Sequence, residues 1–85
     1  MKIRFSKKFV KRFESAYLLI RRNFENNLEI FISNKFDPTL NNHALNGKYI
    51  GYRSINITGD WRALFKDDGN VVLFITLGKH GQLYK

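Results

Sequence analysis

The stretch NHALNGKYIGYRSINITGDWRALFK, residues 42–66, decides the fold, because polar and ionisable side chains alternate in it with core-forming ones. A period of two residues is typical of β-strands. Two runs of turn-forming residues, 58–60 and 67–70, interrupt the alternation. We therefore predict an antiparallel meander of three strands, at residues 49–58, 61–66 and 71–77.

The register of the first hairpin follows from burial. A two-residue loop at Gly59 and Asp60 would mix polar and apolar residues on both faces, whereas a three-residue loop that includes Thr58 gives one nearly continuous apolar face. The second register is predicted, with Ile57 opposite Trp61, Ile55 opposite Ala63 and Arg53 opposite Phe65. The other face would then be an open, polar and basic surface suited to RNA, carrying Tyr52, Ser54, Asn56, Arg62, Leu64 and Lys66.

The N-terminal part combines a short strand with helical periodicity. Residues 2–5 alternate like a strand, Ser6 is a good helix N-cap, and apolar residues then recur with a helical period up to about Asn34. Asp37-Pro38 ends the helical region and begins a loop. We predict a single α+β domain spanning residues 1–85, in which an N-terminal strand and a two-helix hairpin pack on a mainly antiparallel sheet of about four strands.

Composition narrows the possible functions. The chain of 85 residues has a net charge of +8 and no cysteine, which excludes a disulfide framework and any Cys-ligated metal site. Such a charge attracts polyanions: RNA, DNA, an anionic membrane and an acidic protein all fit. No apolar run is long enough to span a bilayer, so we expect a soluble, cytoplasmic protein with no membrane partner. The basic face of the first helix, with Lys7, Lys8, Lys11 and Arg12, is either a solvated surface or a nucleic-acid contact.

Two segments resemble a known family. Residues 43–66 and the ending GKHGQLY, residues 78–84, are similar to the RelE superfamily of bacterial toxin–antitoxin toxins, in the branch near YafQ and HigB. The resemblance runs the length of the chain and implies a RelE-like fold. It also implies a type II toxin that is a ribosome-dependent endoribonuclease, cleaves mRNA in the ribosomal A site and is neutralised by a cognate antitoxin. The implied partners are that antitoxin, the ribosome with its 16S rRNA, and mRNA.

The resemblance also implies which residues catalyse the reaction. The implied chemistry is metal-free transesterification, in which a ribose 2′-OH loses a proton and attacks the adjacent phosphorus while the 5′-oxygen gains one. Histidine suits such proton transfers, and an arginine fork suits the phosphate. No cofactor is implied. The implied catalytic residues are His43, Asp60, Arg62, His80 and Tyr84.

The division of acid and base roles stays open at this level. Where the YafQ-like pattern usually has an aspartate and a histidine on the second strand, this chain has Ser54 and Asn56. Asp60 is also fully explained as a turn former. We further expect substrate contacts from Lys48, Arg53, Asn56 and Lys66, although Arg53 falls on the apolar side of its strand and equally fits a structural role.

Two other functions remain compatible with the sequence. One is a non-enzymatic poison of the same fold, like the ParE toxins that inhibit gyrase. The other is an RNA-binding module without catalysis. His43, His80 and Tyr84 favour the nuclease over both.

Overall fold

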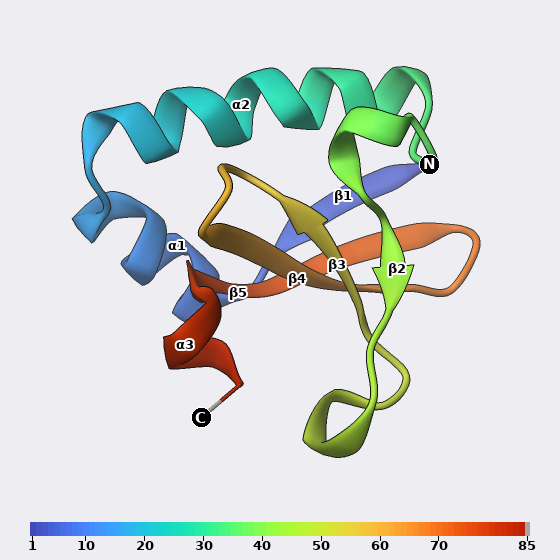
Figure 1. Ribbon diagram of the computed structural model, residues 1–85. Coiled ribbons are helices and arrows are strands. Elements are labelled where there is room, and N and C mark those ends of the chain that lie inside the picture. Colours follow the sequence, from blue (N-terminus) through green and yellow to red (C-terminus); the bar gives the residue numbers. More distant parts are fainter. Residues whose placement is uncertain (85) are drawn as a thin grey trace.

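The computed structural model describes residues 1–84 and shows helices on both faces of a mixed sheet (Figure 1). The five strands lie in the order β1-β5-β4-β3-β2, with β1 parallel to β5 and the other pairs antiparallel. They are β1 (Lys2–Phe5), β2 (His43–Ala44), β3 (Arg53–Asn56), β4 (Trp61–Asp67) and β5 (Val71–Lys79). The helices are α1 (Lys7–Ser15), α2 (Leu18–Ser33), α3 (His80–Leu83) and the 3₁₀ turns η1 (Pro38–Leu40) and η2 (Gly47–Tyr49).

The predicted α+β class is confirmed, and the strand count was one too low. The additional strand, β2, has only two residues, which is too short to show alternation in a sequence. The predicted strand at 49–58 was too long, since β3 begins only at Arg53. Gly47 and Gly51 have φ values of 64° and 91°, and these left-handed conformations keep the chain before Arg53 out of an extended strand. The predicted loop after Asp37 contains η1.

The junction between the two long helices lies at Ala16 and Tyr17. Both residues are extended, with ψ values of 156° and 149°. The predicted N-cap is confirmed, because Ser6 Oγ accepts a hydrogen bond from Phe9 N–H at 3.0 Å. The same hydroxyl donates to the Ile75 carbonyl oxygen at 2.7 Å, which ties the start of α1 to β5. The Ser6 hydroxyl therefore both caps α1 and places its start on the sheet.

The predicted register of the β3–β4 hairpin is confirmed. Arg53 lies opposite Phe65 and Ile55 opposite Ala63, and Ile57 N–H donates to the Trp61 carbonyl at 2.9 Å across the three-residue loop. Side chains on one side of the hairpin therefore enter the core beneath α1 and α2. The other side of the hairpin faces away from these two helices, on the side of the sheet where α3 lies (Figure 1).

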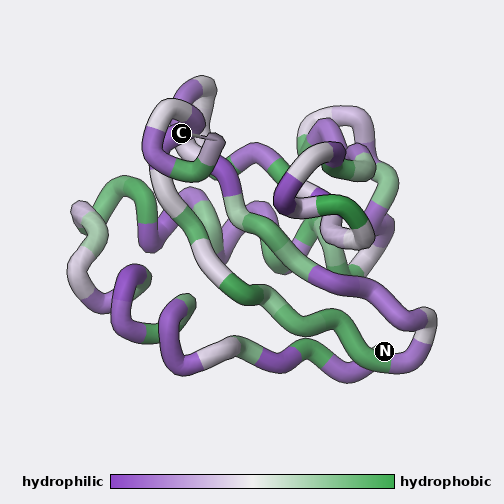
Figure 2. The backbone as a smooth tube through the Cα atoms, turned by 90° about the horizontal axis from the view of Figure 1, so that it is seen from below, coloured by the Kyte–Doolittle hydropathy of each residue, from purple (hydrophilic) through white to green (hydrophobic). Residues whose placement is uncertain are grey.

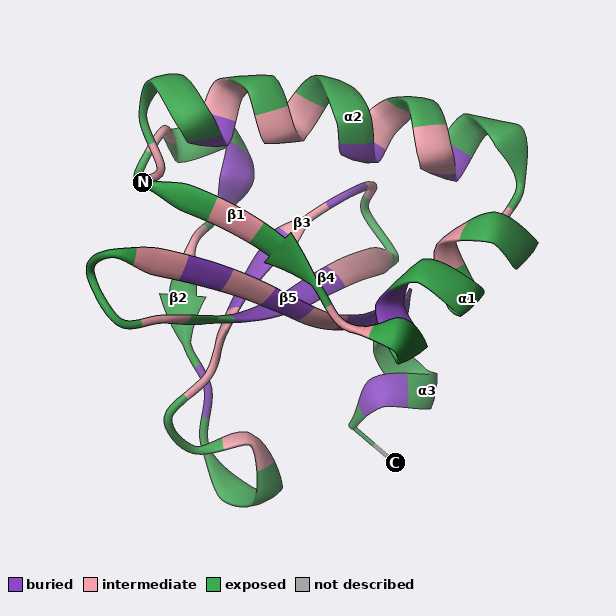
Figure 3. Ribbon diagram, turned by 180° about the vertical axis from the view of Figure 1, so that it is seen from behind, coloured by how far each residue is buried: buried purple, intermediate pink, exposed green. Residues whose placement is uncertain are grey.

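The main core is a cluster of phenylalanine rings around Phe74. This fully buried residue lies in the middle of β5, the strand beside β1 that Figure 2 shows as hydrophobic over most of its length. Figure 3 shows that the buried parts of α1 and α2 face this strand. The ring centroid of Phe74 lies 5.3–5.8 Å from those of Phe5, Phe9, Phe24, Phe31 and Phe65. Such aromatic pairs contribute about 0.5–1.5 kcal/mol each beyond the area they bury.

A second, smaller core covers part of the opposite face. Leu45, Leu64 and Leu83 are buried there, and Tyr49, Tyr52 and Ile75 pack against them. The prediction of a fully open polar face was therefore wrong, and Ser54 and Leu64 are both inaccessible to solvent. The reason is that α3 and the segment before β3 fold across this side of the sheet (Figure 1). Within residues 1–84, no helix is long and apolar enough to cross a membrane.

An ion pair joins the turn after α2 to the end of β4. Lys35 Nζ lies 2.8 Å from Asp67 Oδ2, and only 11% of the Asp67 side chain is exposed. The hydrogen bond from Lys35 lowers the pKa of Asp67 against the opposing effect of burial, and Gly69 N–H supports it at 2.8 Å. A carboxyl whose pKa falls on folding stabilises the folded state above its unfolded pKa of about 3.9. This stabilisation is lost as the pH falls through the folded pKa.

We expect Asp67→Asn to lower the melting temperature at neutral pH and to flatten its decline below about pH 4, where the carboxylate stabilisation would otherwise be lost. Thermal unfolding followed by circular dichroism between pH 2 and pH 7 measures both effects. Lys35→Met removes the other partner of the same ion pair and should likewise flatten the decline of the melting temperature at acid pH. An Asp67→Asn curve parallel to that of the parent protein would contradict this account.

Candidate active site

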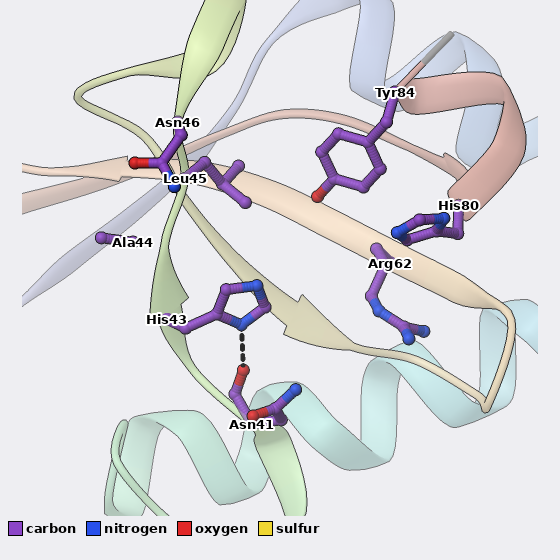
Figure 4. Close-up of a pocket in the computed structure, with 8 residues that line it drawn as sticks. All are labelled: Asn41, His43, Ala44, Leu45, Asn46, Arg62, His80 and Tyr84. Atoms are coloured by element: carbon purple, nitrogen blue, oxygen red, sulfur yellow. Dashed lines mark hydrogen bonds between the residues drawn. The ribbon is translucent and has the colours of Figure 1, made fainter.

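An open cleft of about 390 Å³ lies where α3 faces β2 and β4 (Figure 4). It contains four of the five predicted catalytic side chains, which come from three separate segments of the chain. Within residues 1–84 no Asp or Glu lines it, and the lining residues are Asn41, His43, Ala44, Leu45, Asn46, Arg62, His80 and Tyr84. The cleft is therefore a site of imidazole, guanidinium, phenol and amide groups.

His43 is held in one ring orientation by the backbone before it. Its Nδ1 lies 2.7 Å from the carbonyl oxygen of Asn41. Because a carbonyl oxygen can only accept, Nδ1 carries the proton, and Nε2 of the neutral ring has a free lone pair. Figure 4 shows this second nitrogen turned away from Asn41 and toward the open part of the cleft. The exposed His43 is thus oriented as a proton acceptor.

Asn41 makes this geometry possible. It ends η1 in a left-handed conformation, with φ 49° and ψ 47°, which asparagine tolerates better than most residues. The sequence prediction missed this residue, and the only signal for it was an asparagine shortly after Asp37-Pro38. Asn46 also lines the cleft and was missed, since neither position resembles a catalytic motif.

Arg62 is tethered by the hairpin turn. Its Nη1 donates to the carbonyl oxygens of Thr58, Gly59 and Trp61 at 3.0–3.1 Å. Within residues 1–84 no carboxylate forms an ion pair with it, and its hydrogen bonds all involve Nη1. Nε and Nη2 therefore remain as donors, and the positive charge remains available to an anion in the cleft.

His80 and Tyr84 reach the cleft from α3. They lie one helical turn apart, and their ring centroids are 4.6 Å apart at an interplanar angle of 53°. Two contacts hold this short helix in place: His80 N–H donates to the Asp60 carbonyl at 2.9 Å, and Leu83 is buried in the second core. Tyr84 also meets the edge of Tyr49, with 6.1 Å between ring centroids. Long-range packing therefore sets the positions of both side chains.

The structure does not bring Asp60 into the cleft lining. Asp60 is exposed in the β3–β4 turn, and its backbone carbonyl accepts the hydrogen bond from His80 N–H. This placement favours a structural role for the residue over the catalytic one that the resemblance implied.

The four predicted substrate contacts also lie outside the cleft lining. Arg53 occupies the helix-facing side of β3, where its Nε donates to Asn42 Oδ1 at 2.7 Å and its guanidinium lies 5.6 Å from the Phe36 ring centroid. Lys48 and Lys66 lie over neighbouring tyrosine rings, with Nζ 5.1 Å and 5.9 Å from the centroids. Asn56 is partly buried, and its carbonyl accepts from Asn27 of α2 at 2.7 Å.

Comparison with known proteins identifies the family. A sequence model for "Bacterial toxin of type II toxin-antitoxin system, YafQ" matches residues 1–85. The chain belongs to this YafQ toxin family. The resemblance found in the sequence is therefore confirmed at the level of the family. A comparison with curated proteins found no match.

Solved structures agree with this fold. YafQ from E. coli strain BL21(DE3) is 21% identical, with a TM-score of 0.79 over 99% of this chain and 98% of that one. YafQ in an E. coli DinJ–YafQ complex is 20% identical, with a TM-score of 0.77 over 99% and 98%. A copper-bound mutant toxin from Helicobacter pylori is 26% identical, with a TM-score of 0.76 over 98% of both chains.

The two positions where this YafQ-family toxin has Ser54 and Asn56 are not part of the cleft surface. Ser54 lies opposite His43 in the β2–β3 pair but is fully buried. Its Oγ and Asn56 Oδ1 are buried without a hydrogen-bond partner among the described residues. The histidine side chains that line this cleft therefore come from β2 and α3.

We expect ¹⁵N NMR of imidazole-labelled toxin above neutral pH to show His43 protonated at Nδ1 and unprotonated at Nε2, because the Asn41 carbonyl accepts from Nδ1. His80, which has no such carbonyl bond in the structure, serves as the internal reference. A His43 ring protonated mainly at Nε2 would contradict the observed hydrogen bond.

Proposed function

We propose that this toxin is a ribosome-dependent endoribonuclease that cleaves mRNA in the ribosomal A site by metal-free transesterification. The observation that carries the proposal is the convergence of two histidines, one arginine and one tyrosine in a single open cleft. Among residues 1–84 no group of three or more His, Cys, Asp and Glu side chains is placed to hold a metal ion. Acid–base chemistry by the two histidines needs no such ion.

His43 is the general base in this proposal. Its Nε2 lone pair takes the proton of the ribose 2′-OH, while the Asn41 carbonyl keeps Nδ1 protonated and stabilises the charged ring that forms. The 2′-oxygen then attacks the adjacent phosphorus. The phosphorus–oxygen bond to the 5′-oxygen breaks, and the upstream fragment ends in a 2′,3′-cyclic phosphate.

His80 is the general acid. In its protonated form it donates to the departing 5′-oxygen, so that the downstream fragment ends in a 5′-hydroxyl. The Tyr84 ring, which lies tilted against the His80 ring, limits the freedom of the imidazole and offers a face to a nucleobase. The two histidines come from different elements, β2 and α3, which allows one to act on each side of the phosphate.

Arg62 stabilises the phosphorane. Its free Nε and Nη2 donors match two phosphate oxygens, and the turn carbonyls hold the guanidinium in place before substrate binds. No carboxylate has to be displaced from Arg62 within the described chain. The arginine therefore meets the developing negative charge at little reorganisation cost.

We expect His80→Ala to slow cleavage by about 10²–10⁴-fold, the usual range for loss of one proton-transfer group, and Arg62→Ala by about 10²–10³-fold. Primer extension on a translated messenger, with and without ribosomes, measures the rates. Arg22→Ala removes one exposed positive charge on α2 and is the matched control, for which cleavage should be nearly unchanged. Arg62→Lys tests whether the guanidinium fork is needed beyond its charge.

The same assay separates the alternatives. Parent toxin that leaves ribosome-bound messenger intact but blocks gyrase supercoiling would replace the nuclease by a ParE-like poison. Parent toxin that binds ribosomes without cutting would leave an RNA-binding module. In this proposal the toxin acts on ribosomes and therefore in the cytoplasm, where translation occurs.

We also propose that a cognate antitoxin of acidic character silences this toxin, with support from the DinJ–YafQ complexes of the E. coli relative. The net charge of +8 favours such a partner. We expect the protein encoded beside the toxin gene to co-purify with tagged toxin from a two-gene plasmid and to suppress cleavage. Co-purification with an unrelated acidic protein of equal charge is the control, and equal capture of both would contradict specific neutralisation.

A further inference from the structure

A second groove lies at the end of the sheet where α1 approaches α3. It has a volume of about 620 Å³ and shares no lining residue with the catalytic cleft. Figures 1 and 3 both show the two helices side by side at this end of β5. The groove is lined by Lys8, Lys11, Arg12, Ser15, Ala16, Trp61, Leu77, Gly78 and Gln82.

The charge in this groove has one sign. Three basic side chains of α1 line it, and no Asp or Glu does. None of the three forms an ion pair within residues 1–84. Arg12 lies across the floor, since its Nη1 donates to the Leu77 carbonyl at 3.3 Å and lies 3.5 Å from the place where a Gly78 Cβ would be. The groove therefore offers positive charge beside β5 that no carboxylate of residues 1–84 neutralises by an ion pair.

An aromatic ring forms part of the wall. Trp61 is half-buried, packing against the main core while it also lines the groove. It directly precedes Arg62, and neighbouring residues of a strand point to opposite faces. The start of β4 thus presents its aromatic side chain to the groove and its cationic one to the cleft.

We propose that this groove is a second nucleic-acid site, which takes single-stranded RNA with a base stacked on Trp61 and phosphates bound by Lys8, Lys11 and Arg12. Positive charge beside an aromatic ring that borders a groove is the combination used for single strands, because the phosphates need cations and every base has a π-face. An acidic peptide would satisfy the cations but would gain nothing from the ring. The RNA that fits is a flexible strand whose bases are unpaired.

Trp61 reports binding directly, because it is the single tryptophan of the chain. We expect a 2′-O-methyl oligouridylate, which cannot be cleaved, to quench Trp61 fluorescence in a saturable way. Lys8→Ala with Lys11→Ala should weaken binding about tenfold and reduce the slope of log affinity against log salt by about 1.4, since each phosphate contact on a single strand contributes about 0.7. The matched control is Lys2→Ala with Arg22→Ala, two exposed cations outside the groove, for which both quantities should change far less.

The contribution of stacking is tested by anisotropy of a labelled oligouridylate. Trp61→Leu should weaken binding about tenfold, whereas Trp61→Phe keeps a ring and should bind nearly as the parent does. Equal affinity of Trp61→Leu and Trp61→Phe would overturn the proposal. An equal loss of affinity in the Lys8/Lys11 double variant and in the Lys2/Arg22 control variant would also overturn it. Displacement of the oligonucleotide by an oligoglutamate of equal charge and at equal concentration would also overturn it. Because the ligand is not cleaved, a toxin without nuclease activity gives the same result.

Discussion

The register of the β3–β4 hairpin is the constraint on which both candidate binding surfaces depend. The three-residue loop pairs Ile57 with Trp61 and sends Trp61 toward the helices and Arg62 toward the cleft. A slip of one residue would exchange the faces of the whole strand. It would drive the Arg62 guanidinium into a core of phenylalanine rings, where an unpaired charge costs several kcal/mol. Burial of Ile55, Ala63 and Phe65 therefore fixes the position of the cationic group that the proposed chemistry needs.

The short helix α3 covers part of the second face of the sheet and borders both proposed sites. Leu83 packs on Leu64 and closes a small core, and the Asp60 carbonyl fixes the first residue of α3. On one side of this helix His80 and Tyr84 complete the cleft, and on the other side Gln82 borders the basic groove. A helix of only four residues has little stability of its own. Its position, and with it both sites, depends on contacts with residues that are distant in the sequence.

The basic side chains of this protein fall into two groups, those that line a concave surface and those that make structural contacts within the fold. Arg62 is held in place by three carbonyl groups, and Arg12 by one, so that both are positioned before they meet the phosphates that we propose they bind. Arg53 instead donates a hydrogen bond to Asn42 and lies over the Phe36 ring. Lys35 forms the ion pair with Asp67. The number of basic residues therefore overestimates the number of cations that are free to bind an anionic partner. The cations best placed to bind an anion are those that line a concave surface and have no carboxylate partner.

The strand and helix periods, the Ser6 cap and the hairpin register could be predicted from the residues alone, because each follows from local spacing or from which face must be buried, and the net charge follows from composition. Together with the family resemblance the sequence also named the four side chains that meet in the cleft. Three features could not be predicted and became visible in the folded chain: the Asn41 carbonyl fixes the His43 tautomer, α3 covers the predicted open face, and Asp60 and Arg53 lie outside the cleft lining. Those outcomes depend on packing between residues far apart in the chain, and hydrophobic periodicity carries no information about such contacts.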